Sequence, residues 1–191
     1  MQFKGTAVYP HLNDPDKKFD PDGPGVFQLQ LSLGAEDSQR LIERIEAVRD
    51  TAYEEECKKR KKPKLKKADL PFQEEYDEDQ KPTGNWLFRI KLKAETAKGH
   101  AQRPTLVDTK LQPMTERIGS GSLVVVDFDP RPWFSAPLGL GVTLRLRGVM
   151  VVELKELSGS TVTFEAMEGF ETASANMNTD ISEVTTDDDD F

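Results

Sequence analysis

The chain has 191 residues, a formal net charge of −8 and one cysteine, Cys57. This length fits one domain of ordinary size beside a shorter segment. A lone cysteine excludes an internal disulfide and zinc or redox chemistry, and it fits a reducing compartment. The N-terminal residues show no signal-peptide pattern. The longest apolar runs, residues 123–126 and 149–152, are too short to span a membrane.

Alternating apolar residues predict two strands near the N-terminus. Phe3–Tyr9 alternates loosely, and Val26–Leu33 does so regularly. One face of the second strand is apolar, formed by Phe27, Leu29, Leu31 and Leu33, while Gln28, Gln30 and Ser32 form the other. Residues 11–25 between them are rich in Pro, Asp and Gly, which predicts a loop.

A helix is predicted over residues 36–59. Its apolar face recurs at three- and four-residue steps, at Leu41, Ile42, Ile45, Val48 and Ala52. Asp37 and Ser38 are the expected caps at its start, and Pro63 must end it. Its last turns enter a basic run over residues 58–67, where eight of ten positions are cationic: Lys58, Lys59, Arg60, Lys61, Lys62, Lys64, Lys66 and Lys67. Eight cations exceed what a helix dipole needs.

The next segment, residues 69–84, is acidic and ends in the turn signal Pro82-Thr83-Gly84. Strand patterns follow at Trp86–Lys93, Thr105–Thr109, Leu123–Asp129 and Val142–Leu154. Trp86 alternates with core positions of its strand, so we interpret it as a core residue. Residues 119–122 form a Gly-Ser-Gly-Ser turn, and the Pro/Gly-rich residues 130–141 predict a loop. About five strands with one inserted helix predict a small Greek-key barrel or sandwich.

Catalytic and metal-binding patterns find little support. His11 and His100 lie in loop-like segments, and no nucleophile–base arrangement follows from spacing. The acidic run Glu74–Asp79 lacks a calcium-loop pattern, so a solvated loop is the expected structure. The turn at residues 119–122 lacks the Lys of a phosphate-binding loop. We therefore expect no enzyme, no metal site and no cofactor.

Cations and aromatic residues indicate nucleic-acid binding. On the strand Trp86–Lys93, one face presents Arg89, Lys91 and Lys93 about 6.5 to 7 Å apart, from a rise of about 3.3 Å per residue. Arg145 and Arg147 repeat this arrangement on the last strand, and Arg131, Trp133 and Phe134 share one segment. Cationic grooves with stacking aromatics bind single strands with little sequence preference. The alternative for each strand is an ordinary solvated face.

The last 34 residues, 158–191, hold nine acidic residues and no Lys or Arg. They account for −9 of the charge, so residues 1–157 sum to about +1 and the overall pI of 4.9 does not describe the body. Such a composition predicts a flexible tail. Its end, Asp187 to Asp190 followed by Phe191, suggests an acidic peptide with one apolar anchor that docks on a partner. A plain solubilising tail is the alternative.

Several motifs occur in an order that resembles the gene 2.5-type single-stranded DNA-binding proteins of T7-like bacteriophages. In chain order they are Gly25-Val26-Phe27, Lys61-Lys62-Pro63, Asp69-Leu70-Pro71-Phe72, Phe88-Arg89-Ile90-Lys91, Val107-Asp108-Thr109-Lys110, the Gly-Ser-Gly-Ser turn, Pro130 with Trp133, Val149 to Leu154, and the acidic end Asp190-Phe191. No single motif is specific for this family, but the order of the motifs along the chain is. In this sequence Arg131 stands where that family has a stacking tyrosine.

The resemblance implies an oligonucleotide-binding (OB) fold, a homodimer and single-stranded DNA binding in phage replication, recombination and repair. It also implies strand annealing, docking of the tail on phage DNA polymerase and helicase-primase, and location in the cytoplasm of the infected bacterial host. We expect a mainly β OB-fold domain at residues 1–157, a five-stranded Greek-key barrel with one inserted helix, and a disordered acidic tail at residues 158–191. The predicted DNA-binding residues are Lys59, Lys61, Lys62, Arg89, Lys91, Lys93, Arg131, Trp133, Arg145 and Arg147; those of the tail that bind the partner are Asp187, Asp188, Asp189, Asp190 and Phe191. An acidic-tailed interaction adaptor and an RNA-binding OB protein remain alternatives.

Overall fold

A computed structural model describes residues 1–18 and 20–155 of the chain. The acidic tail predicted at residues 158–191, with its partner-binding residues, lies outside these residues, and the domain boundary stays a prediction. The described residues form one helix, α1 (Ala35–Arg60), and seven strands: β1 (Gln2–Asp16), β2 (Val26–Leu33), β3 (Phe72–Tyr76), β4 (Pro82–Lys93), β5 (Thr105–Val107), β6 (Leu123–Ser135) and β7 (Gly139–Glu153).

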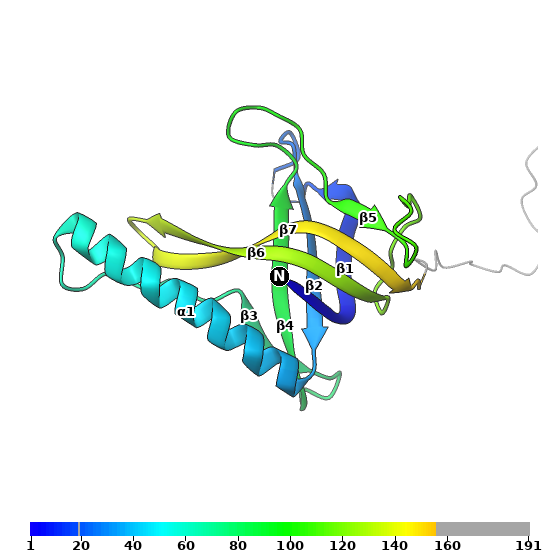
Figure 1. Cartoon of the computed structure of the whole chain (residues 1–191), viewed down its shortest axis with the longest axis horizontal. Coiled ribbons are helices and arrows are strands. Elements are labelled where there is room, and N and C mark those ends of the chain that lie inside the picture. The colour runs from blue at the N-terminus through cyan, green and yellow to red at the C-terminus, as the bar shows by residue number, and fades with distance from the viewer. Residues whose placement is uncertain (19, 156–191) are drawn as a thin grey trace, which may run out of the picture. The chain divides into compact units, whose positions relative to one another are not determined.

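Five of these strands close into a barrel (Figure 1). β1 pairs with β2 and β6, β2 with β4, and β6 with β7, all antiparallel. The barrel closes where β4 and β7 run parallel, with Ile90 opposite Leu144 and Lys91 opposite Arg145. β3 extends the sheet beside β4, and β5 pairs with β7. This closed five-stranded barrel with one inserted helix confirms the predicted OB-fold.

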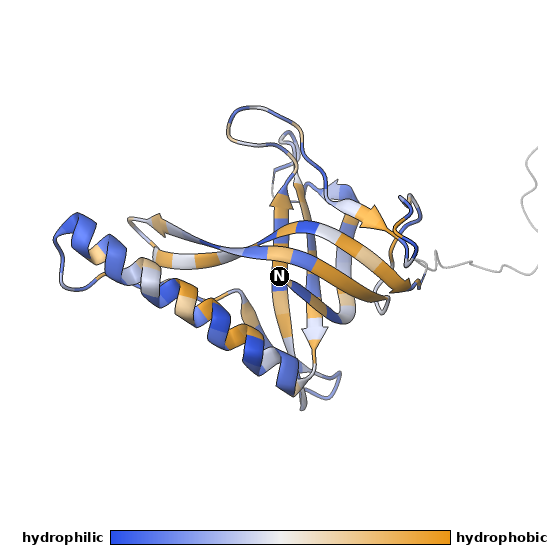
Figure 2. Cartoon of the chain, in the orientation of Figure 1, coloured by the Kyte–Doolittle hydropathy of each residue, from blue (hydrophilic) through white to orange (hydrophobic). Residues whose placement is uncertain are grey.

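The interior of the barrel is apolar because alternate residues of each strand point inward. Phe27, Leu29 and Leu31 on β2 are at most 2% exposed, and Phe88 and Ile90 on β4 are fully buried. Burial of each such side chain contributes roughly 1.5–3 kcal/mol. Figure 2 shows the resulting alternation of hydrophobic and hydrophilic residues along the barrel strands. The intervening polar residues of β2 and β4 are therefore held on the outer face.

The helix matches its predicted extent but not its predicted cap. Its buried residues are Ser38, Leu41 and Ile45, as its apolar periodicity requires. The N-cap is Gly34, whereas the Ser38 hydroxyl donates to the Leu33 carbonyl at 2.9 Å. Asp37 pairs with Arg40 at 3.3 Å. The predicted caps are therefore wrong, because Ser38 faces the core.

The chain after the helix packs along the hairpin of β6 and β7. Helix α1 ends with Lys61 in a left-handed conformation, φ 52°, ahead of Pro63. Ala68 then donates its backbone N–H to the Leu140 carbonyl at 2.8 Å, and Leu140 donates to the Lys66 carbonyl at 2.8 Å. The guanidinium of Arg60 lies 3.7 Å from the ring centroid of Phe134. The basic run thus fastens the helix end to this hairpin.

Three segments predicted as loops or turns are strand over part of their length. β1 continues to Asp16 through two register shifts. The Pro and Asp residues of this segment are typical of loops, so the sequence pattern did not indicate a strand there. Residues 130–135 and 139–141, predicted as a loop, form the outer part of the β6–β7 hairpin. The acidic segment contains β3, and its predicted turn at Pro82 is the start of β4.

Partial burial of Trp86 confirms its predicted core role. Its indole packs edge-to-face on the Phe72 ring, with centroids 5.7 Å apart, beside the barrel core.

Candidate nucleic-acid interface

The outer face of β2 and β4 carries polar and cationic side chains in register. Gln28 lies opposite Lys91, and Gln30 lies opposite Arg89. Their neighbours along both strands are buried in the barrel, so the backbone fixes which way these four side chains point. β2 and β4 are the second and third strands of the barrel, and in OB-folds the face of these two strands is where oligonucleotides bind.

A hollow of about 570 Å³ lies over this face and is called here the central groove. Arg89 and Lys91 line it from β4, and Gln28 and Gln30 from β2. Leu29 and Ile90 of the same two strands also line it. Its remaining lining comes from β1, from the loop before β2, from the segment before β3 and from the β6–β7 hairpin, as Tyr9, His11, Asp16, Lys18, Asp69, Pro71, Trp133, Val142 and Thr143. Arg89 and Lys91 are exposed, so both can reach a polyanion in the groove.

A second hollow of about 640 Å³ continues from the first and is called the side groove. The two share Lys91, Trp133 and Thr143. Lys93, Arg131 and Arg145 line the side groove only. The side groove therefore extends the cationic lining from β4 across to β7 and the hairpin.

Trp133 lies where the two grooves meet, on a strand rather than on the predicted loop. It pairs with Gly141 across the hairpin. A β-carbon at Gly141 would collide with the indole and would come within 3.1 Å of Ala68, so the glycine lets the ring lie close over β7. The indole is half-buried and lines both grooves. A ring held in this way is suited to stacking with a base.

Acidic neighbours reduce the positive field at two of the predicted arginines. Arg131 lies 3.4 Å from Asp129, and Arg147 lies 3.6 Å from both Asp127 and Asp129. Arg147 lines a different, more apolar hollow beside β5. Arg145 instead donates a hydrogen bond to the uncharged side chain of Gln102 at 3.1 Å, so this contact does not neutralise its charge.

The structure brings six of the ten predicted DNA-binding residues together and places four elsewhere. The six around the two grooves are Arg89, Lys91, Lys93, Arg131, Trp133 and Arg145. Among the described residues lining either groove, none is Lys59, Lys61, Lys62 or Arg147. The three lysines are exposed at the end of α1, and Lys59 lies 4.0 Å from Glu56.

Sequence reasoning missed the contribution of β1 and β2 to the site. Gln28 and Gln30 were visible as the polar face of a strand, and only the pairing of β2 with β4 places them beside the cations. The sequence pattern predicts Tyr9 as the end of a strand, whereas in the structure it lines the central groove and is 70% exposed. No sequence pattern marked the backbone irregularity at which it lies.

Another lysine of the basic run stabilises the attachment of the helix. Lys67 donates to Asp50 on α1 at 3.1 Å. This hydrogen bond, with Arg49 nearby, lowers the pKa of Asp50 below its usual value. Tyr53 accepts a hydrogen bond from the Leu65 backbone at 3.0 Å and lies 4.7 Å below the Lys67 ammonium. Part of the run is thus engaged in structural contacts.

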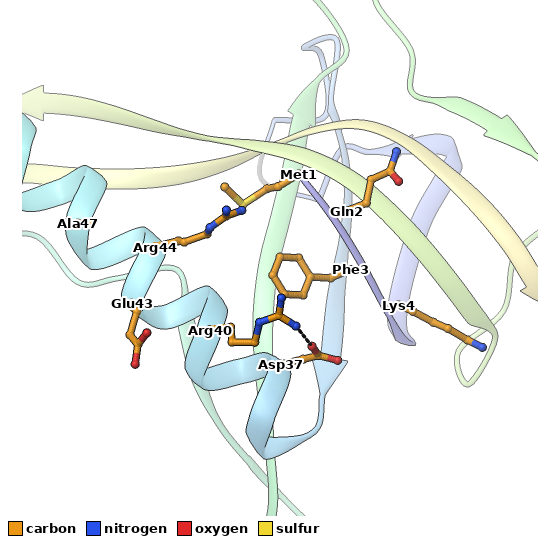
Figure 3. A pocket seen from close by; sticks show the side chains of 9 residues that line it. All are labelled: Met1, Gln2, Phe3, Lys4, Asp37, Arg40, Glu43, Arg44 and Ala47. Carbon is orange, nitrogen blue, oxygen red and sulfur yellow. Dashed lines mark hydrogen bonds and ion pairs between the residues drawn. The ribbon is translucent and has the colours of Figure 1, made fainter.

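A separate hollow of about 590 Å³ lies between β1 and the first half of α1 (Figure 3). Its cationic side chains, Lys4, Arg40 and Arg44, are accompanied by Asp37 and Glu43, and Arg40 points to Asp37 in an ion pair. This hollow has three cationic and two acidic side chains, whereas the two grooves together have six cationic and three acidic ones, so the grooves carry the larger positive charge.

In the part of the chain that the structure describes, no group of three His, Cys, Asp or Glu is placed to hold a metal ion. No helix within those residues has the length and apolarity needed to cross a membrane.

Three of the solved structures similar to this one are of bacteriophage proteins. The single-stranded DNA-binding protein gp2.5 of bacteriophage T7 has a TM-score of 0.66 and 27% identity, over 91% of this chain and 99% of that one. The single-stranded DNA-binding protein of bacteriophage Enc34, in complex with single-stranded DNA, has a TM-score of 0.54 and 19% identity, over 81% and 88%. A further structure of the Enc34 protein has a TM-score of 0.55 and 15% identity, over 85% and 87%.

The likeness to the T7 protein confirms the family resemblance predicted from the sequence motifs. At their lower identities, the Enc34 structures show a shared fold. No protein-family model matches the sequence, and none of the curated proteins matches it significantly.

Proposed function

We propose that this chain is a bacteriophage single-stranded DNA-binding protein that covers exposed DNA strands with little sequence preference. The observation that carries the proposal is the pair of joined grooves, cationic on β4 and β7 and with Trp133 where they meet. The likeness to the T7 protein over nearly the whole chain supports it.

The chemistry of the grooves suits a single strand better than a duplex. Arg89, Lys91 and Arg145 can neutralise phosphates, and release of the condensed counterions then drives binding. The indole of Trp133 offers a face on which an unpaired base stacks, and every base has such a face. In a duplex the bases are already stacked on one another and cannot use it. In this proposal Lys59, Lys61 and Lys62 attract the DNA from outside the grooves. Arg147 also attracts it, although Asp127 and Asp129 lie beside its guanidinium.

The biological role follows the family resemblance. We include in the proposal a homodimer, strand annealing, and action in replication, recombination and repair in the cytoplasm of the infected bacterial host. The chain acts by binding rather than as an enzyme. The acidic residues Asp187, Asp188, Asp189 and Asp190, with Phe191 as anchor, recruit DNA polymerase and helicase-primase.

A binding assay with labelled oligo-dT, oligo-U and duplex DNA of equal length tests the proposal. We expect oligo-dT to bind tightest, with log affinity falling against log salt at a slope of about −3 to −4 if four to six phosphates are contacted, at about −0.7 per contact. Tighter binding of oligo-U would favour the RNA-binding alternative. Absence of binding to all three would favour the interaction adaptor.

Two changes in the tail separate its proposed roles. Removal of Ser174–Phe191 should abolish polymerase binding and tighten DNA binding at low salt, because a tethered polyanion competes for a cationic groove. Phe191→Ala keeps every acidic side chain, so this competition should persist while partner affinity falls by about 1.5–3 kcal/mol if the ring becomes buried. If neutralising the four aspartates abolishes partner binding while Phe191→Ala does not weaken it, the tail is an electrostatic tether without an anchor.

A further inference from the structure

Tyr9 adopts a backbone conformation that is unusual for a bulky residue. Its φ is +47°, in the left-handed region that favours glycine. It lies in β1 at the register shift between Val8 and His11, where the ladder with β2 is interrupted. Such a conformation costs free energy and persists only where surrounding contacts hold it.

The turn at residues 119–122 supplies these contacts. The backbone N–H of Tyr9 donates to the Ser120 hydroxyl at 2.9 Å. Two more hydrogen bonds fix the chain two residues earlier, because Ala7 donates to the Ser122 carbonyl at 2.9 Å and accepts from Gly121 at 2.8 Å. The Gly-Ser-Gly-Ser turn therefore holds the bulge in β1 as well as connecting strands.

The bulge turns the aromatic ring of Tyr9 outward, where the ring contributes little to folding. Tyr9 is 70% exposed, whereas the strand residues Ala7 and Leu12 on either side are buried. It lines the central groove together with Arg89, Lys91 and Trp133. It also lines an adjoining hollow of about 310 Å³, whose other lining residues include Asn13 and Ser120. An exposed ring on a strained backbone, at the rim of a cationic groove, is better explained by a ligand than by packing.

We propose that Tyr9 is a second stacking platform, on which an unpaired nucleobase of the bound strand lies. The inference rests on the proposed function and extends it, because it continues the path of the strand from Trp133 across the central groove to β1. Tyr9 lines this groove from β1, and Trp133 lines it from the β6–β7 hairpin.

Three variants of the full chain test the platform by binding to fluorescent oligo-dT. Tyr9→Phe keeps the ring and should bind like the wild type. Tyr9→Ala should bind roughly 5- to 150-fold more weakly, since stacking of one base is lost. The slope of log affinity against log salt should stay the same in both, because the ring carries no charge.

Tyr9→Gly separates binding from folding. Glycine tolerates the positive φ, so this variant should unfold at a higher temperature than Tyr9→Ala. It should nevertheless bind DNA as weakly as Tyr9→Ala. A merely structural role predicts instead that affinity follows stability across the two variants.

Tyr76→Ala is the matched control, since Tyr76 is also an exposed tyrosine, 55% accessible, and lies on β3 outside the grooves. It should bind like the wild type. Photo-crosslinking to an oligonucleotide containing 5-iododeoxyuridine should label the Tyr9 peptide and not the Tyr76 peptide. Wild-type affinity in Tyr9→Ala would overturn the platform alone, whereas absence of DNA binding by the wild type would overturn the proposed function with it.

Discussion

Two regions of the molecule are rich in cations, and they differ in what surrounds those cations. The run at residues 58–67 has eight basic residues in ten, which is the higher density by far. In it Arg60 lies over Phe134, Lys67 pairs with Asp50, and the Lys66 backbone pairs with Leu140. The outer face of β4 and β7 has fewer cations, but there they line a groove together with Trp133.

The difference teaches that the density of charge along a sequence does not locate a binding site. A helix end and the segment after it spread their side chains around an axis, so part of the run meets the protein itself. A strand in a closed barrel has one face in the core, which forces every second side chain onto the same outer surface. A few cations on two neighbouring strands therefore concentrate more of their positive charge on one surface than many cations at a helix end do.

The largest effect should follow loss of three groove cations. We expect the triple variant Arg89→Ala, Lys91→Ala and Arg145→Ala to reduce the steepness of the salt dependence by about 2, at about 0.7 per phosphate contact. At 0.1 M salt this corresponds to roughly a 100-fold loss of affinity for oligo-dT. Titrations at several salt concentrations measure both. An unchanged slope in a folded triple variant would place the phosphates elsewhere.

Trp133→Ala should weaken oligo-dT binding somewhat less than the triple variant of the groove does. Loss of one stacked base costs on the order of 1–3 kcal/mol, and the salt slope should not change because no charge is removed. Trp133→Phe keeps an aromatic face and should recover much of the affinity. Circular dichroism checks that both variants stay folded, since the ring also packs over Gly141. Full affinity in folded Trp133→Ala would return the residue to a packing role.

The basic run provides a matched comparison with the groove. The triple variant Lys59→Ala, Lys61→Ala and Lys62→Ala removes the same number of charges from exposed positions. We expect the salt slope to change by no more than about 0.7, the equivalent of one phosphate contact. Oligo-dT titrations under the same conditions give the answer. A loss as large as that of the groove variant would show that DNA leaves the groove along the helix end.

The smallest effect should be at Asp50, whose pair with Lys67 fastens the run to the helix. Asp50→Asn should lower the free energy of unfolding at neutral pH by at most about 1 kcal/mol, because the pair is exposed. The lowered pKa of Asp50 means that the contribution is present above the ordinary aspartate pKa and is lost as the pH falls through the lowered value. The difference between wild type and variant, measured by urea unfolding, should therefore vanish in acid. DNA affinity at neutral pH should not change.

Much of the fold could be predicted from periodicity. The strand Val26–Leu33 and the helix over residues 36–59 match the structure closely, because each has one apolar face with the period of its element. The cationic face of β4 followed from the same alternation. Where Pro, Asp or Gly interrupts the pattern, as at residues 11–16 and 130–135, strands were mistaken for loops. There the strand is maintained by pairing with the neighbouring strand, as where His11 lies opposite Gln28 and Ser135 opposite Gly139, and the pattern of one segment alone does not record this pairing.

The sequence by itself determined which side chains leave the barrel, since burial of every second strand residue leaves the alternate ones no other direction. It also determined that cations and Trp133 are available for a polyanion. Only the tertiary structure decided which of them meet. The parallel pairing of β4 with β7 brings Lys91 beside Arg145, and the folding back of the β6–β7 hairpin brings Trp133 to both. The bulge that exposes Tyr9 depends on a hydrogen bond to Ser120, 111 residues away, and so lies beyond any local reading of the chain.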